Sequence, residues 1–189
     1  MNGRNALDRY GALAIFLHWF MVLLIAAVYA CMELSGSFPI GSDMREGLKT
    51  WHYMLGLCVL VLVICRLVVR FTKHVPHITP SPSKWQRNFA SAMHVALYVL
   101  MVVLPILGWL ILSAKGSIVP FFGLELPHLI SESKSNAGWI KEIHETGAAI
   151  GYFLIGLHAA AGLFHHYFVK DNTLRRMLPQ RKEMMRDVV

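Results

Sequence analysis

Four long apolar segments constrain the fold of this chain more than any other feature. Each is long enough to cross the hydrocarbon core of a membrane, which takes about 20 apolar residues. They cover roughly residues 13–34, 51–71, 89–112 and 143–167. Together they occupy nearly half of the 189 residues and leave little for a separate soluble domain. The sequence therefore predicts one domain over residues 1–189, an all-α integral membrane bundle of four transmembrane helices.

Charge sets the expected orientation of this bundle. The chain is 56% hydrophobic and only 15% charged, which is unusual for a soluble domain. A net charge of +7 would suit a nucleic-acid-binding protein. However, 13 of the 18 Lys and Arg residues lie on one side of the predicted bundle, the side that carries both ends of the chain. The positive-inside rule places that side in the cytoplasm, so we expect lipid around the protein and no nucleic-acid partner.

Two of the connections between the predicted spans have distinctive compositions. The segment from Lys73 to Ser83 contains three prolines, which predicts an extended cytoplasmic loop. The connection between the third and fourth spans contains an apolar stretch, Ile118 to Leu126, which we expect to lie against the outer surface of the membrane.

Histidines inside the predicted spans are the main candidates for a functional site. Five of the ten lie within the spans or at their edges, away from the cytoplasmic rim: His18, His52, His94, His144 and His158. A polar side chain in hydrocarbon costs free energy, so each of these histidines is a functional candidate. The alternative is a histidine that only hydrogen-bonds to a neighbouring helix.

Depth sorts these histidines into two pairs. His18 and His158 lie towards the cytoplasmic ends of their spans, whereas His52 and His144 lie at the outer ends. The 14 residues between His144 and His158 put both on nearly one helix face, about 21 Å apart. This spacing predicts two bis-histidine sites, one above the other. His94 lies at a depth similar to that of His18, so the residues alone leave the inner partner open.

Small residues lie between the two histidines of the last span, among them Gly147, Gly151 and Gly156. They leave room for a porphyrin, although small residues in membrane helices also serve close helix packing. Zinc needs three or four clustered ligands, which two distant pairs do not provide. No C-x-x-C-H motif is present, which excludes covalent c-type haem attachment. His165, seven residues after His158, is a reserve ligand.

Several motifs resemble the prokaryotic cytochrome b561 family over nearly the whole chain. They are H-W at His18, W-H ending at His52, R-x-x-x-R from Arg66 to Arg70, and a terminal block from H-E-T at His144 to K-D-N-T-L at Leu174. The resemblance implies a four-helix protein of the bacterial inner membrane that binds two b haems. It assigns His18 and His158 to the cytoplasmic haem and His52 and His144 to the periplasmic haem, and it makes His94 a non-ligand.

Two stacked haems form an electron path, and the sequence contains no flavin or nucleotide fingerprint. The resemblance favours an oxidoreductase that passes electrons from periplasmic superoxide to ubiquinone. The alternative is a quinone-linked anchor subunit of a periplasmic dehydrogenase or hydrogenase, and a homo-oligomer or a redox partner subunit remains open. We expect ubiquinone near the inner haem, beside His94, His158 and Arg66. Superoxide is an anion, so its encounter rate would rise if some of the outer basic residues clustered: Arg45, Lys49, Lys115, Lys134 and Lys141.

Overall fold

The computed structural model describes residues 9–73 and 75–179. Four long helices lie side by side: α1 (Ala12–Ser35), α2 (Asp43–Thr72), α3 (Lys84–Ala114) and α4 (Lys134–Phe164). All four are long and apolar enough to cross a membrane. The predicted spans are confirmed, and each helix begins before its span. His74 and four basic residues counted for orientation lie outside the described residues: Arg4, Arg181, Lys182 and Arg186.

Serine caps explain why three helices begin outside the apolar segments. Ser42 and Ser133 each accept a hydrogen bond from a backbone N–H in the first turn, of α2 and α4 respectively. Ser83 forms a capping box with Gln86 at the start of α3. Such caps satisfy N–H groups that lack an intrahelical partner. The helices therefore start in polar sequence and carry their apolar segments into the bundle.

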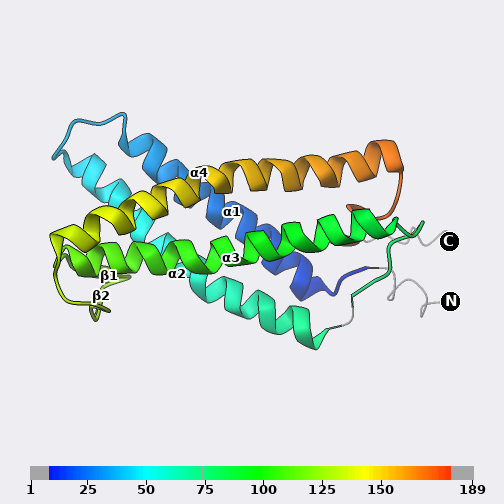
Figure 1. Ribbon diagram of the computed structural model, residues 1–189, viewed down its shortest axis with the longest axis horizontal. Coiled ribbons are helices and arrows are strands. Elements are labelled where there is room, and N and C mark those ends of the chain that lie inside the picture. The colour runs from blue at the N-terminus through cyan, green and yellow to red at the C-terminus, as the bar shows by residue number, and fades with distance from the viewer. Residues whose placement is uncertain (1–8, 74, 180–189) are drawn as a thin grey trace, which may run out of the picture.

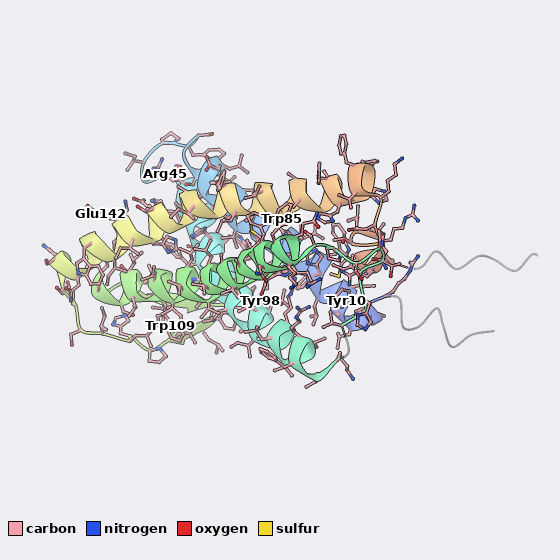
Figure 2. All side chains as sticks on the ribbon, turned by 45° about the vertical axis from the view of Figure 1, so that its right-hand side comes forward. Tyr10, Arg45, Trp85, Tyr98, Trp109 and Glu142 are labelled. Atoms are coloured by element: carbon pink, nitrogen blue, oxygen red, sulfur yellow. The ribbon has the colours of Figure 1, made fainter. Side chains whose placement is uncertain are left out.

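Both described ends of the chain lie at one end of the bundle, called the inner end here after the predicted orientation (Figure 1). The backbone N–H of Tyr10 donates to the carbonyl of Arg176 at 3.2 Å. Trp19 donates from Nε1 to the Met177 carbonyl at 2.7 Å. Figure 2 shows Tyr10 at this end and Glu142 towards the opposite, outer end. This arrangement agrees with both termini lying on one side of the membrane.

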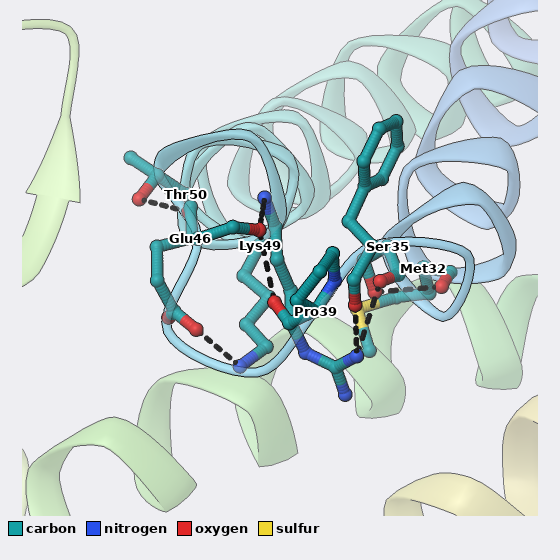
Figure 3. Close-up of polar contacts among 9 residues, drawn as sticks. Met32, Ser35, Pro39, Glu46, Lys49 and Thr50 are labelled. Atoms are coloured by element: carbon teal, nitrogen blue, oxygen red, sulfur yellow. Dashed lines mark hydrogen bonds and ion pairs between the residues drawn. The ribbon is translucent and has the colours of Figure 1, made fainter.

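The outer end is closed by two connections. At the start of α2, Lys49 forms an ion pair with Glu46 at 2.8 Å, and Arg45 donates to the carbonyls of Ser35 and Phe38 in the connection from α1 (Figure 3). The apolar stretch between α3 and α4 folds into a two-stranded hairpin, β1 (Val119–Phe121) and β2 (Leu124–Leu126). The sequence analysis did not predict these strands.

The hairpin packs onto the bundle rather than standing free. Its turn residues, Phe122 and Gly123, have φ values of 48° and 86°, as a tight two-residue turn requires. Val119 is buried with Leu57 of α2 and Leu112 of α3. The apolar stretch therefore buries one residue in a protein core, while Ile118, Phe122 and Leu124 stay exposed at the outer end.

Helix packing leaves α1 and α4 linked mainly by polar side chains. The main core joins α1, α2 and α3 around Met21, Leu24, Val59 and Val63. In contrast, the Tyr29 hydroxyl donates to the Ala148 carbonyl at 2.9 Å across the α1–α4 seam. The Tyr152 hydroxyl donates to Glu33 at 2.7 Å in the same region. The inward histidines lie on either side of this bridge.

Candidate functional site: two histidine pairs

The outer pair joins α2 and α4. The ring centres of His52 and His144 lie 6.2 Å apart, and the ring planes are 78° apart. Metal–imidazole bonds are about 2.0–2.1 Å long, and the ring centre lies about 1.1 Å beyond the nitrogen. Two imidazoles on opposite sides of one metal therefore have centres about 6.3 Å apart. The separation of the outer rings fits axial ligation of one iron.

Backbone carbonyls fix both rings of the outer pair. Nδ1 of His52 lies 2.9 Å from the carbonyl of Val28, and Nδ1 of His144 lies 3.0 Å from that of Leu104. A carbonyl only accepts, so each Nδ1 carries the proton and each Nε2 keeps its lone pair. This is the usual outer-shell arrangement of a histidine that binds metal.

The inner pair joins α1 and α4. The ring centres of His18 and His158 lie 6.4 Å apart, again close to the axial distance, with planes at 70°. His94 of α3 lies 5.7 Å from His158, which is shorter than that distance. The structure brings all three inner histidines together, and the spacing fits His18 better as the partner of His158.

Arg66 contacts the inner pair directly. Its Nη1 lies 3.1 Å from Nδ1 of His18. Arginine only donates, so here Nδ1 of His18 accepts and the ring proton sits on Nε2. A metal at Nε2 requires the other tautomer, and Arg66 then needs a different acceptor. Arg70, one turn further along, donates to the hydroxyl of Tyr10 at 3.1 Å.

The glycines of α4 divide into packing and open positions. A Cβ at Gly147 would lie 2.7 Å from Leu104 of α3, and a Cβ at Gly151 would clash with the Tyr29 hydroxyl. Nothing lies within 4 Å of a Cβ at Gly156. Two of the three glycines therefore serve close packing, and the open space is at Gly156, two residues before His158.

Two features of the site were not evident from the sequence. A pocket of about 330 Å³ at the outer ends of α3 and α4 is lined by Lys115, Lys134 and Lys141, with Glu132 as the acidic residue. At the inner end, His165 is hydrogen-bonded to Asp171, and its ring lies against Phe164. The K-D-N segment after the last helix was the sequence feature that could have pointed to Asp171. The contact between Asp171 and His165 depends on the π-helical turn, which the segment does not predict.

A membrane bundle with paired inward histidines belongs to the class of transmembrane b-type cytochromes, in which protein side chains hold the haem iron. The family model described as prokaryotic cytochrome b561 matches residues 9–180. Cytochrome b561 homolog 1 of Escherichia coli is 43% identical over 93% of this chain and 100% of the relative. The probable superoxide oxidase CybB of Yersinia pestis is 37% identical over 92% of this chain and 98% of the relative.

The chain therefore belongs to the prokaryotic cytochrome b561 family. It is a multi-pass protein of the bacterial inner membrane that binds b-type haem and transfers electrons. The predicted family, fold and location are confirmed.

Proposed function

We propose that the protein holds two b-type haems and passes electrons from periplasmic superoxide to ubiquinone. His52 and His144 would hold the outer haem, and His18 and His158 the inner one. The observation that carries the proposal is geometric: ring centres 6.2 Å and 6.4 Å apart at two levels of one bundle. When bound, each haem supplies an iron that takes up and releases one electron.

The two sites lie at a distance that suits electron transfer. His144 and His158 are on the same continuous helix, α4, which runs unbroken from Lys134 to Phe164. Fourteen residues at about 1.5 Å each separate them by roughly 21 Å. One continuous helix therefore carries a histidine of each site, one towards each side of the membrane.

The lysine pocket supports entry of an anion at the outer end. Lys141 precedes His144 by three residues, which places it about 4.5 Å nearer the outer end of the helix. It forms an ion pair with Glu145 at 2.7 Å, whereas Lys115 and Lys134 form no ion pair within the described residues. Unpaired positive charge at a hollow raises the local concentration of anions and their encounter rate. Three of the five outer basic residues therefore gather where superoxide would arrive.

No proton is needed at the outer end, because one electron leaves superoxide and oxygen departs. Ubiquinone, in contrast, takes up two electrons and two protons. Its proposed place is near the inner pair, where His94, His158 and Arg66 converge. Once Nδ1 of His18 carries the proton, Arg66 is free to donate to a haem propionate or a quinone carbonyl.

Pulsed superoxide with rapid optical detection tests the proposal on the purified protein alone. We expect reduction of the Soret-absorbing centres within the pulse, followed by reoxidation when ubiquinone is added. The 37% identical relative described as a probable superoxide oxidase supports this expectation. If superoxide leaves the absorbance unchanged, and reduction appears only with an added periplasmic dehydrogenase, the chain is an anchor subunit.

A further inference from the structure

A buried arginine lies in the tail that follows α4 and its π-helical turn, His165–Val169. Arg176 belongs to a short 3₁₀ helix, η2 (Arg175–Met177), and is only 6% exposed. Its Nη1 donates to the carbonyl of Pro76 in the α2–α3 connection, and its Cζ lies 5.6 Å from the centre of the Tyr10 ring. Its Nε is buried and has no hydrogen-bond partner among the described residues. Because burying a charge costs free energy unless it is paired, this N–H indicates a further acceptor.

The neighbouring carboxylate does not provide this acceptor. Asp171 is the acidic residue that interacts with Arg176. Its Oδ2 is hydrogen-bonded to Nδ1 of His165 at 2.6 Å, and its Oδ1 accepts from the backbone N–H of Thr173 at 2.8 Å. Arg70 brings a second positive charge close to Arg176. Positive charge is therefore in excess among these described residues, and a carboxylate or a phosphate would match both the charge and the N–H.

The tail brings Arg176 close to the inner histidine pair. Nε1 of Trp19 donates at 2.7 Å to the carbonyl of the residue after Arg176, and the ring centres of Trp19 and His18 lie 5.4 Å apart. From another side, Arg176 interacts electrostatically with His94, whose ring centre lies 5.7 Å from that of His158. Contacts with two separate helices, α1 and α3, therefore place the guanidinium at the inner end of the site that this pair forms.

We infer that Arg176 binds a carboxylate of the inner haem through Nε, so that the tail holds the cofactor from the inner side. The inference rests on the proposed haem between His18 and His158. A b-type haem carries propionate groups, which are anions at neutral pH and take no part in binding the iron. An arginine N–H and a carboxylate form a short, charge-assisted hydrogen bond. Because Arg176 also joins the tail to the α2–α3 connection, one residue fixes both the cofactor and the inner end of the bundle.

Infrared difference spectroscopy of the whole haem-loaded protein tests this contact. Cells supplied with aminolaevulinate that carries heavy carbon make haem labelled at its propionate carboxylates. The label identifies the propionate bands among those that change when the haems are reduced electrochemically. Arg176→Gln should shift the band of an inner propionate. The variant should also lose the inner haem to an excess of apomyoglobin about tenfold faster, because a charge-assisted hydrogen bond is gone, while the outer haem leaves at the wild-type rate.

Arg175→Gln is the matched control, because Arg175 is the exposed neighbour with the same charge. Asn172→Ala loosens the tail without changing Arg176, since the Asn172 side chain bonds to the backbone of Thr79 and the carbonyl of His77. Both variants should keep the wild-type propionate bands and release rates. Arg176→Lys should retain more inner haem than Arg176→Gln, because the charge remains. Unshifted bands in Arg176→Gln, or equally fast loss of inner haem in Asn172→Ala, would overturn the inference.

A lipid phosphate offers similar chemistry, and vesicles of different composition distinguish it from the haem carboxylate. In phosphatidylcholine vesicles with and without phosphatidylglycerol, the effect of Arg176→Gln should be the same. An effect that requires the anionic lipid and leaves the labelled bands unshifted would assign the site to lipid and overturn the inference. A parent protein without an inner haem would contradict the proposed function itself, whereas an inner haem with unshifted bands in Arg176→Gln would contradict this inference alone.

Discussion

The outer and inner histidine pairs have the same spacing but different surroundings. At the outer pair, both rings are held through Nδ1 by main-chain carbonyls of neighbouring helices, those of Val28 and Leu104. At the inner pair, Nδ1 of His18 faces Arg66 instead, and a third histidine, His94, stands 5.7 Å from His158. The outer rings are held by main-chain carbonyls, whereas the inner pair is in contact with an arginine side chain and a third histidine.

This difference matches the chemistry proposed for each end. Removing one electron from superoxide needs only a rigid acceptor and an attractive charge. Reducing a quinone needs a binding group, and the inner end provides Arg66 beside the histidine pair. The asymmetry therefore supports the proposed direction of electron flow, from the outer pair to the inner pair.

Removing one ligand from each pair should have the largest effect. His144→Ala should abolish the outer haem and His158→Ala the inner one, because each variant leaves a single imidazole for the iron. Pyridine haemochrome quantitation should give about half of the wild-type haem in each variant. Electron paramagnetic resonance should assign the lost signal. Full haem content in both variants would contradict the pairing.

The next largest effect should come from Arg66→Leu. Haem content should stay at the wild-type value, but the inner haem potential should fall, since a nearby positive charge favours the reduced form. Loss of a hydrogen bond from a charged group, worth roughly 1.5–3 kcal/mol, should slow quinone reduction about tenfold or more. Arg70→Leu is the control, because Arg70 is exposed and bonded to Tyr10. Unaltered potential and kinetics in Arg66→Leu would refute its role.

Removing the outer lysines should have a smaller effect, on the rate of haem reduction by superoxide. Replacing Lys115, Lys134 and Lys141 together by Gln should slow haem reduction by superoxide roughly two- to fivefold at low salt. The deficit should vanish at about 1 M salt, where charges are screened within about 3 Å. Lys49→Gln serves as the control, because Lys49 is already paired with Glu46. A deficit that persists at high salt would mean that the lysines act through structure.

His94→Ala should have the smallest effect on haem content. The ring centre of His94 lies 5.7 Å from that of His158, closer than two imidazoles that hold one iron require, so both haems should remain. Measuring the haem content per chain tests whether His94 is a haem ligand. Loss of one haem would make His94, and not His18, the inner partner of His158.

The four-helix fold could be predicted because each helix is specified by its own stretch of apolar sequence. Apolar segments of membrane length fix the four helices, and the serine caps Ser42, Ser83 and Ser133 explain where three of them begin. The hairpin was missed because its apolar residues fit a membrane surface as well as a strand. The pairing of Phe121 with Leu124 and the positive φ values at Phe122 and Gly123 show that the chain turns there.

The site was predictable in part. The depth of each histidine along its helix predicted which histidines lie close together. Depth alone did not distinguish His18 from His94 as the partner of His158, because that choice depends on ring spacing. The carbonyl partners of His52 and His144 belong to other helices, and no sequence pattern specifies which backbone atom a ring will meet. The same holds for His165, whose partner Asp171 is brought back by a π turn.

Haem stoichiometry of the purified, unaltered chain tests the central claim most directly. A visible spectrum combined with pyridine haemochrome quantitation reports haem type and number together. The two histidine pairs predict two haems per chain, both of b type and both low-spin, as bis-histidine ligation requires. A single haem per chain, or a high-spin spectrum at either site, would contradict the paired arrangement of His18 with His158 and of His52 with His144.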